Sequence, residues 1–175
     1  MAPRKTISKL DANRLWEYAL RVLGMRAHSM GELRAKLSRK ASTPADVAEV
    51  LTKLSEYGLV DDRKFSETFA SGRLQNHGFG RHRVLRELRG KRVGSKIAEE
   101  AVNKTFADTD ESTLIAQFLQ RKYRGKNLRE LVKDERQLAS IYRRLRTAGF
   151  SSGNSLAVLR RYKQDIGDWD EPAEE

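Results

Sequence analysis

The sequence predicts an all-α fold in which tandem repeats of three-helix units form an elongated, curved array. Apolar residues recur every three or four positions through most of the chain, as at Val47, Val50, Leu51 and Leu54, which is the spacing of one buried helix face. The composition is rich in Leu, Ala, Arg, Lys and Glu, which favour helices, and contains only three prolines. Helix-ending signals recur at short intervals, which indicates small repeated units. One compact helical bundle is the alternative arrangement.

Residues 1–11 are expected to form a disordered basic leader, and residues 12–60 are expected to form the first three-helix unit. The first helix is predicted over residues 12–23, because its apolar residues share one face. Gly24 is expected just past the end of that helix, where glycine often stands.

Two capping signals begin the other helices of this unit. Ser29 and Glu32 have the spacing of a capping box, in which each side chain accepts the backbone N–H of the other residue. Thr43 is expected to cap the third helix. Pro44 then occupies the first helical position, where its missing N–H costs nothing.

A tight turn leads into the second unit, which is predicted over residues 61–108. Gly58 supplies the left-handed conformation that ends a helix without a Cβ clash. Either Asp61 or Asp62 is expected to accept N–H groups at the start of the next helix, whose inward face begins with Phe65. These carboxylates are therefore better explained as helix caps than as a magnesium pair.

The second unit repeats the plan of the first, with helices over residues 63–76 and 81–89 and a third helix after Ser95. The break between its first two helices contains Gly78 and Gly80. These glycines indicate a turn.

A looser third unit is predicted over residues 109–164. Its helices are expected at residues 113–123 and 134–147, with a last helix that ends near Tyr162. The residues between Asn127 and Lys133 are expected to lengthen one of the flanking helices.

Charge is the strongest indication of function. The formal net charge is +11, and residues 165–175 hold six acidic residues and no basic one. Residues 1–164 therefore carry 35 basic against 18 acidic side chains, a net charge of +17. A helical protein this positive usually faces phosphates, although charge that serves only solubility is the alternative. The acidic tail is expected to be disordered; a sharper hypothesis is that it mimics phosphate and covers the basic faces.

Several function classes lack their signatures. The chain has no cysteine, no apolar run near the roughly 20 residues of a membrane span and no secretory signal, which suits a cytoplasmic protein without disulfides. It has no phosphate-loop motif and no His-Glu-x-x-His pair. His77 and His82 flank two glycines, where a turn is a simpler explanation than a metal site. We therefore expect no cofactor, no metal and no enzymatic activity.

The basic helices favour nucleic-acid binding. With Val84 and Leu88 turned inward, the helical spacing places Arg83 and Arg86 outward. Positive charge in the first turn of that helix opposes the helix dipole, so folding preference alone does not explain it. Such rows of cations would follow a phosphate backbone with little sequence preference. The predicted nucleic-acid or filament-binding residues are Arg81, Arg83, Arg86, Arg89, Lys91, Arg92, Arg121, Lys122, Arg124, Lys126, Arg136, Arg143, Arg144, Arg160 and Arg161.

Two tyrosines stand beside these clusters. Tyr123 and Tyr162 are placed either to stack on unpaired bases or to cover the edges of the core.

Over residues 14–103 the chain resembles the RecX family, bacterial regulators of the RecA recombinase. The resemblance rests on Tyr18-Ala19-Leu20…Leu23, Arg26…Ser29…Glu32-Leu33…Leu37, Gly58-Leu59-Val60-Asp61-Asp62…Phe65…Phe69…Arg73 and Gly80…Val84…Glu87-Leu88. The third unit is similar only through Leu138…Leu145…Gly149-Phe150-Ser151. The chain departs from the family pattern at residues 90–93, which read Gly-Lys-Arg-Val.

The resemblance implies tandem three-helix repeats, a cytoplasmic protein and no catalytic residues. It also implies binding to RecA and to the RecA–DNA filament, with inhibition of ATP hydrolysis, strand exchange and coprotease activity. The expected partners are thus the RecA filament and DNA, single- or double-stranded, for a protein expected to be a monomer away from membranes. A stand-alone DNA- or RNA-binding protein, with the helix of Arg83 and Arg86 as its recognition helix, is the alternative.

Overall fold

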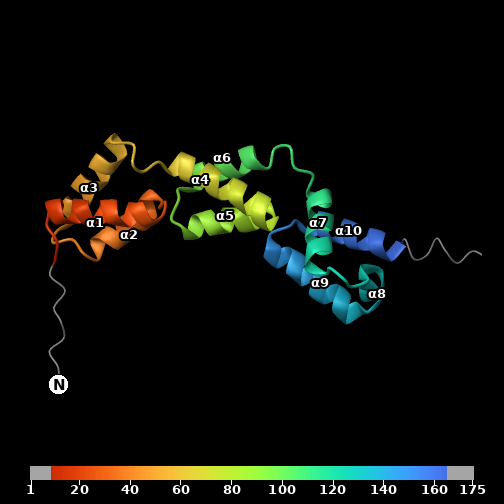
Figure 1. Ribbon diagram of the computed structural model, residues 1–175. Helices are drawn as coiled ribbons and strands as arrows, with labels where there is room; N and C mark the ends of the chain where they lie inside the picture. The colour runs from red at the N-terminus through yellow and green to blue at the C-terminus, as the bar shows by residue number, and fades with distance from the viewer. Residues whose placement is uncertain (1–8, 165–175) are drawn as a thin grey trace, which may run out of the picture. The chain divides into compact units, whose positions relative to one another are not determined.

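A computed structural model describes residues 9–164. Within these residues the chain forms ten α-helices and one π-helical turn and has no β-sheet, so the predicted all-α fold is confirmed (Figure 1). The described residues divide into two compact units, one of residues 9–69 with 88–101 and one of residues 70–87 with 102–164. We call these the first and the second unit. The predicted acidic tail, residues 165–175, lies outside the described residues.

Three helices begin the first unit: α1 (Ala12–Met25), α2 (Met30–Ser38) and α3 (Pro44–Glu56). Helix α3 packs against both α1 and α2 (Figure 1). The core between them is apolar, and four leucines in it have no exposed surface: Leu15, Leu33, Leu37 and Leu54. This burial is what the three-to-four spacing of the apolar residues predicts.

The caps of these helices follow the sequence closely, with one exception. Thr43 and Asp46 form a reciprocal capping box at α3. Ser29 accepts the Glu32 N–H at 3.1 Å, but the Glu32 side chain does not return to Ser29, because it binds Arg26 and Lys91 instead. The predicted capping box at α2 is therefore wrong in its second half.

Two predicted boundaries of the first unit also change. Leu10 forms a single bridge to Ala41, and Asp11 caps α1 by accepting the Arg14 N–H at 3.0 Å. Residues 9–11 of the predicted leader are thus held by hydrogen bonds to residues 39–42 and to Arg14. Gly24 lies inside α1 and not past its end, since the helix continues to Met25.

The middle of the chain forms α4 (Asp62–Gly72), the π-helical turn η1 (Arg73–His77), α5 (Arg81–Gly90) and α6 (Ser95–Thr105). Each of these three α-helices contributes residues to both units.

The two adjacent carboxylates before α4 have different partners. Asp61 accepts the N–H groups of Arg63 at 2.8 Å and Lys64 at 3.1 Å, so it is the cap of α4. Asp62 instead accepts the N–H of Met30, the first residue of α2, at 2.7 Å. The pair therefore ties the start of α4 and the start of α2 together.

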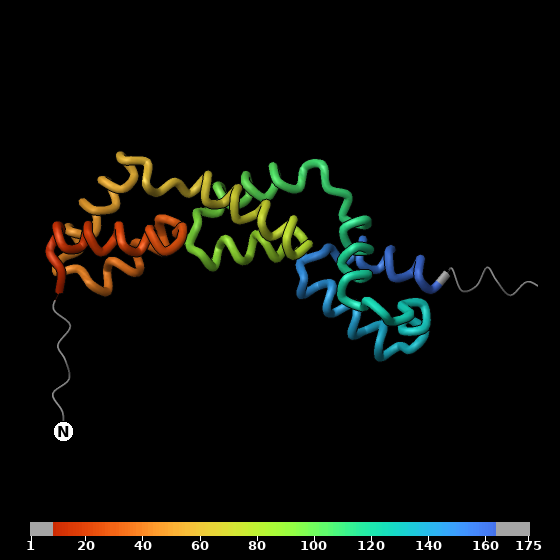
Figure 2. The backbone as a smooth tube through the Cα atoms, in the orientation of Figure 1, coloured from red at the N-terminus to blue at the C-terminus, as the bar shows by residue number. Residues whose placement is uncertain are grey.

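Four helices end the described chain: α7 (Glu111–Lys122), α8 (Leu128–Lys133), α9 (Glu135–Ala148) and α10 (Ser152–Gln164). They pack together in the second unit around a core that includes Phe150. The sequence predicted no separate helix α8. It forms because Asn127 caps it and Val132 is completely buried. Figure 2 shows it as a short helix before α9.

A close backbone approach fixes the start of α5 within the second unit. Gly80 donates its N–H to the carbonyl of Ala148 at 2.9 Å, and His82 donates to Gly149 at 3.1 Å. A Cβ atom at Gly80 would lie less than 3.0 Å from the Gly149 carbonyl. Only glycine at residue 80 allows this contact.

Candidate nucleic-acid interface

The second unit contains a large open cavity of about 740 Å³, which we call the cationic cavity. It is formed by the turn before α5, the start of α5, and the helices α7 and α9. Its charged lining residues are Arg83, Arg121, Lys122, Arg143 and Arg144, and none of its described lining residues is acidic. Its other lining residues are Asn76, His77, Phe79, Phe118, Ser140, Thr147 and Ala148.

Two contacts hold Arg83 in place in this cavity. Its guanidinium lies 3.6 Å from the centre of the Phe79 ring, and its Nε donates to Glu87 at 2.9 Å. Phe79 is in turn stacked on His77, with ring centres 5.1 Å apart and planes within 13°. Glu87 also lies 2.7 Å from Nε of Arg73, an ion-pair contact that is not aligned as a hydrogen bond.

Both Arg83 and Arg86 were predicted to point outward, and the structure differs from this prediction at Arg83. Arg83 is half-buried and packed on Phe79, because its long stem turns back over the preceding turn. Arg86 is exposed but donates to the carbonyl of Thr147 at 3.3 Å. A helical wheel gives the direction of a Cβ atom and not the path of such a side chain.

The other four cations of the cavity come from α7 and α9 and are exposed. Arg121 donates to the carbonyl of His77 at 3.2 Å, and the Arg144 guanidinium lies 5.6 Å from the Tyr123 ring centre. Within residues 9–164, the side chains of Lys122 and Arg143 make no hydrogen bond or ion pair. Their charges are therefore available to an anionic ligand.

A left-handed glycine lets the π-helical turn meet α7. Gly78 ends the π-helical turn with φ of 60°, and the Arg121 guanidinium occupies the position where a side chain at residue 78 would begin. π-Helical turns are rare and are often found at functional sites. Here the turn places His77 and Asn76 at the edge of the cavity.

Besides Arg86, six predicted cations of the second unit lie outside the cavity lining. Arg81 donates to Asn103, Arg136 lies in the first turn of α9, and Arg161 lies near Asp110. Arg124 and Lys126 are exposed in the turn after α7. They add positive charge to the same unit.

A sixth, Arg160, lines a separate, mostly apolar hollow on α9 and α10 with Leu138, Tyr142 and Leu156.

Of the two roles considered for Tyr123 and Tyr162, stacking on bases or covering the core, the structure favours the second. Tyr123 and Tyr162 are half-buried and pack against the core cluster of the second unit. They cover its edges, and the exposed aromatic residue of the cationic cavity is His77 instead.

The predicted residues Arg89, Lys91 and Arg92 belong to the first unit. Arg89 forms an ion pair with Glu99 at 3.0 Å, and Lys91 lies 3.2 Å from Glu32. Arg92 has a left-handed φ of 59°, and its backbone lies where a side chain on Gly31 would stand. The Lys91 contact is partly buried and gives this residue a structural role, whereas the Arg89 ion pair is exposed.

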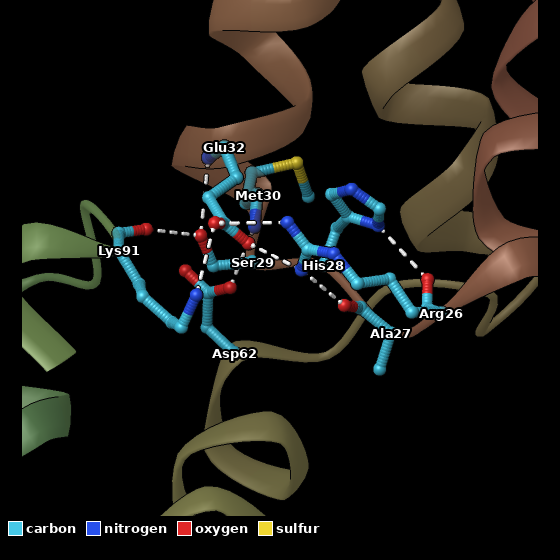
Figure 3. A network of polar contacts seen from close by, with 8 residues as sticks. All are labelled: Arg26, Ala27, His28, Ser29, Met30, Glu32, Asp62 and Lys91. Carbon is cyan, nitrogen blue, oxygen red and sulfur yellow. Dashed lines mark hydrogen bonds and ion pairs between the residues drawn. The ribbon is translucent and has the colours of Figure 1, made fainter. Parts of the chain in front are cut away.

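The Lys91 contact is part of a polar network at the start of α2 (Figure 3). The Glu32 carboxylate binds Arg26 at 3.1 Å and Lys91 at 3.2 Å, and the Ser29 hydroxyl donates to the Lys91 carbonyl. Burial alone would raise the pKa of Glu32, but the hydrogen bonds from Arg26 and Lys91 outweigh it and hold that pKa below its ordinary value.

His28 lies beside this network and is 4% exposed. Its Nδ1 is 2.8 Å from the carbonyl oxygen of Arg26, which can only accept, so Nδ1 carries the proton. Nε2 is then an acceptor that has no partner among the described residues. Burial lowers the pKa of His28, so the ring is neutral at physiological pH.

The described residues hold no group of three or more His, Cys, Asp or Glu side chains that could bind a metal ion. In the same part of the chain, no helix is long and apolar enough to cross a bilayer.

Sequence reasoning did not place His77, Phe79 and Phe118 at a site. The break at residues 77–80 was the only local signal, because its glycines allow close backbone contacts. Phe118 follows the ordinary apolar spacing of α7, and nothing in that spacing marks it as part of a cavity.

Comparison with known families now adds to this geometry. Residues 16–54 match the model of the first three-helix domain of RecX, and residues 61–102 match that of the second. These ranges hold the helices of the first two predicted repeats.

Curated relatives extend the match beyond these two domains. Regulatory protein RecX of Chromohalobacter salexigens is 33% identical over 124 residues, which are 70% of this chain and 80% of the relative. That of Syntrophotalea carbinolica is 29% identical over 93% of this chain and 97% of the relative. That of Photobacterium profundum is 32% identical over 83% of this chain, which spans about half the length of that relative.

Solved structures agree on the fold. The crystal structure of RecX from Lactobacillus salivarius superposes with a TM-score of 0.65 at 19% identity, covering 88% of this chain and 97% of the other. Domain models, curated relatives and fold together lead to one assignment. The chain belongs to the RecX family of regulatory proteins.

Proposed function

We propose that the chain is a non-enzymatic regulator that binds RecA and RecA–DNA filaments and inhibits RecA ATP hydrolysis, strand exchange and coprotease activity. Membership of the RecX family supports the partner. The observation that carries the proposal is the cationic cavity of the second unit, whose described lining holds five cations and no acidic residue. A filament of protein and DNA is a polyanion that such a surface attracts.

A filament repeats its subunits and phosphates, so one bound chain can contact it at more than one point. Once one surface is bound, a second contact forms at a high effective concentration, so weak contacts sum to a stable complex. A regulator held in this way would oppose the subunit movements that accompany ATP turnover. In this proposal the protein acts in the cytoplasm as a monomer.

The experiment that tests this proposal measures ATP hydrolysis by RecA on single-stranded DNA, with the protein added below one molecule per RecA. The expected result is inhibition that persists when DNA is in excess and competitor DNA is added. Unchanged hydrolysis at saturating protein would contradict the proposal. Inhibition that competitor DNA abolishes would reduce it to simple occlusion of DNA.

The rival proposal, a stand-alone protein with α5 as its recognition helix, is disfavoured by the start of that helix. Recognition helices contact base edges through their N-terminal residues. At the start of α5 the N–H groups of Gly80 and His82 are bonded to the carbonyls of Ala148 and Gly149, and Arg83 is packed on Phe79. Tight, sequence-specific binding to a naked duplex near physiological salt would nevertheless favour the rival.

A further inference from the structure

The cationic cavity has unused positive charge of a particular kind. Lys122 and Arg143 make no side-chain hydrogen bond or ion pair within residues 9–164. Arg83 uses its Nε for Glu87 and one face for Phe79, and its two Nη atoms have no hydrogen-bond partner among the described residues. A guanidinium held in this way has given up much of its rotamer freedom before a ligand arrives. It is suited to a phosphate, which accepts such paired donors.

The cavity also has an unfinished aromatic stack. His77 and the Arg83 guanidinium both contact Phe79, with the His77 and Phe79 rings nearly parallel and the guanidinium over the Phe79 ring. His77 is exposed. One more flat ring added to His77 would extend the stack, and a nucleobase is such a ring.

A paired base cannot do this, since its faces are covered by its neighbours in the duplex. An acidic protein segment supplies the negative charge but offers a flat ring only where it also carries an aromatic side chain. The volume of about 740 Å³ leaves room for a sugar and a phosphate beside the base.

We propose that the cationic cavity binds one nucleotide unit of a single-stranded nucleic acid, with the phosphate on Arg83, Lys122 and Arg143 and the unpaired base against His77. The inference rests on the proposed function, because it names the part of the filament that this site would contact. It predicts a preference for single strands over duplexes.

The test uses the full chain and a thymidine oligomer that carries one 2-aminopurine, whose fluorescence falls when the base stacks. The charge variant is Lys122→Glu with Arg143→Glu. Its matched control is Lys126→Glu with Arg136→Glu, which makes the same charge change outside the cavity. The stacking variants are His77→Ala and His77→Phe, and His82→Ala is the control.

Wild type should quench the 2-aminopurine in the single strand and not in its duplex. The charge variant should bind at least about tenfold more weakly, and its salt slope should fall by about 0.7 for each phosphate that it no longer neutralises, with a smaller effect in its control. His77→Ala should abolish quenching and weaken binding about tenfold, while His77→Phe and His82→Ala retain both.

Any of the following results would overturn the inference. They are equal binding by the charge variant and its control, quenching that survives His77→Ala, and competition by polyglutamate as strong as that by the oligomer at equal charge. A free nucleotide that binds as tightly as the strand would also contradict the strand assignment. RecA is absent from this assay, so these results would not contradict the proposed regulation of RecA. That proposal fails only if the wild-type protein does not inhibit RecA.

Discussion

Lys91 and Glu32 form an ion pair at the start of α2, where the Lys91 ammonium lies 3.2 Å from the Glu32 carboxylate. The Lys91 carbonyl also accepts the hydroxyl of Ser29, the residue that caps the same helix. The turn after α5 is thus held to α2 through both its side chain and its backbone. A residue predicted to bind nucleic acid has its charge balanced within the first unit.

Glu32→Gln should weaken this contact and lower the free energy of unfolding by about 1 to 2 kcal/mol at neutral pH. Because the folded-state pKa of Glu32 is depressed, its contribution is present above the unfolded-state value and is lost as pH falls through the folded value. Urea denaturation at several pH values measures this. The difference in the free energy of unfolding between wild type and variant should shrink as the solution becomes acidic.

Glu49→Gln is the matched control, since Glu49 is exposed on α3. A Glu32→Gln gap that stays constant from neutral to acidic pH would contradict the assignment of the pKa shift.

Gly80→Ala should destabilise the second unit by about 1 to 3 kcal/mol, because the new methyl group would collide with the backbone of Gly149 and could be accommodated only by a backbone shift. Gly24→Ala is the control. Nothing lies within 4 Å of its Cβ position inside α1, so alanine should stabilise the protein by about 0.5 to 1 kcal/mol. Thermal unfolding of both variants gives the comparison, and equal behaviour would reject the close approach.

Glu111→Ala should lower the free energy of unfolding by about 2 kcal/mol. Glu111 accepts the N–H of Ser151 at 2.8 Å and the side-chain amide N–H of Asn154 at 2.6 Å, at the start of α10. Burial raises the pKa of Glu111, but the hydrogen bonds from Ser151 and Asn154 lower it further than burial raises it. The destabilisation should therefore be largest near neutral pH and shrink in acid.

Gln117→Ala is the control. Gln117 is exposed on α7, the helix of Glu111, so this substitution should change the free energy of unfolding little. Denaturant titration at two pH values would show whether the cost of Glu111→Ala is independent of pH, which would contradict this account.

Asp61→Ala and Asp62→Ala should each cost about 1 kcal/mol, but at different helices. Removing the Asp61 carboxylate should speed hydrogen exchange at the N–H groups of Arg63 and Lys64. Removing the Asp62 carboxylate should speed exchange at Met30. Exchange measured residue by residue separates the two, and the same pattern in both variants would refute this division.

Most helices could be predicted because their apolar spacing and caps are local properties. Helix α8 could not, since its six residues are too few to show a period and its stability depends on burying Val132 in the second unit. The contact between Glu32 and Lys91 also could not be predicted from the sequence. The choice of Lys91 over the N–H of Ser29 depends on residues far apart in the sequence.

The candidate site was predicted in its charges and not in its shape. Arg121 and Lys122 were named from a basic cluster, and Arg143 and Arg144 from the outward face of their helix. The structure gathers all four with Arg83 around one cavity. The aromatic side of that cavity joins His77 to Phe118. No local pattern relates two residues on separate segments, so only the folded chain brings them together.

The backbone contact between residues 80–82 and 148–149 limits how the molecule can be dissected. A truncation after residue 102, where the match to the second family domain ends, would keep the donors of Gly80 and His82 and discard both acceptors. The complementary fragment would hold acceptors without donors. Isolated fragments made at that border would therefore understate both the stability and the binding of the whole chain, and any assay of separate domains should keep α5 and the turn before α10 on one polypeptide.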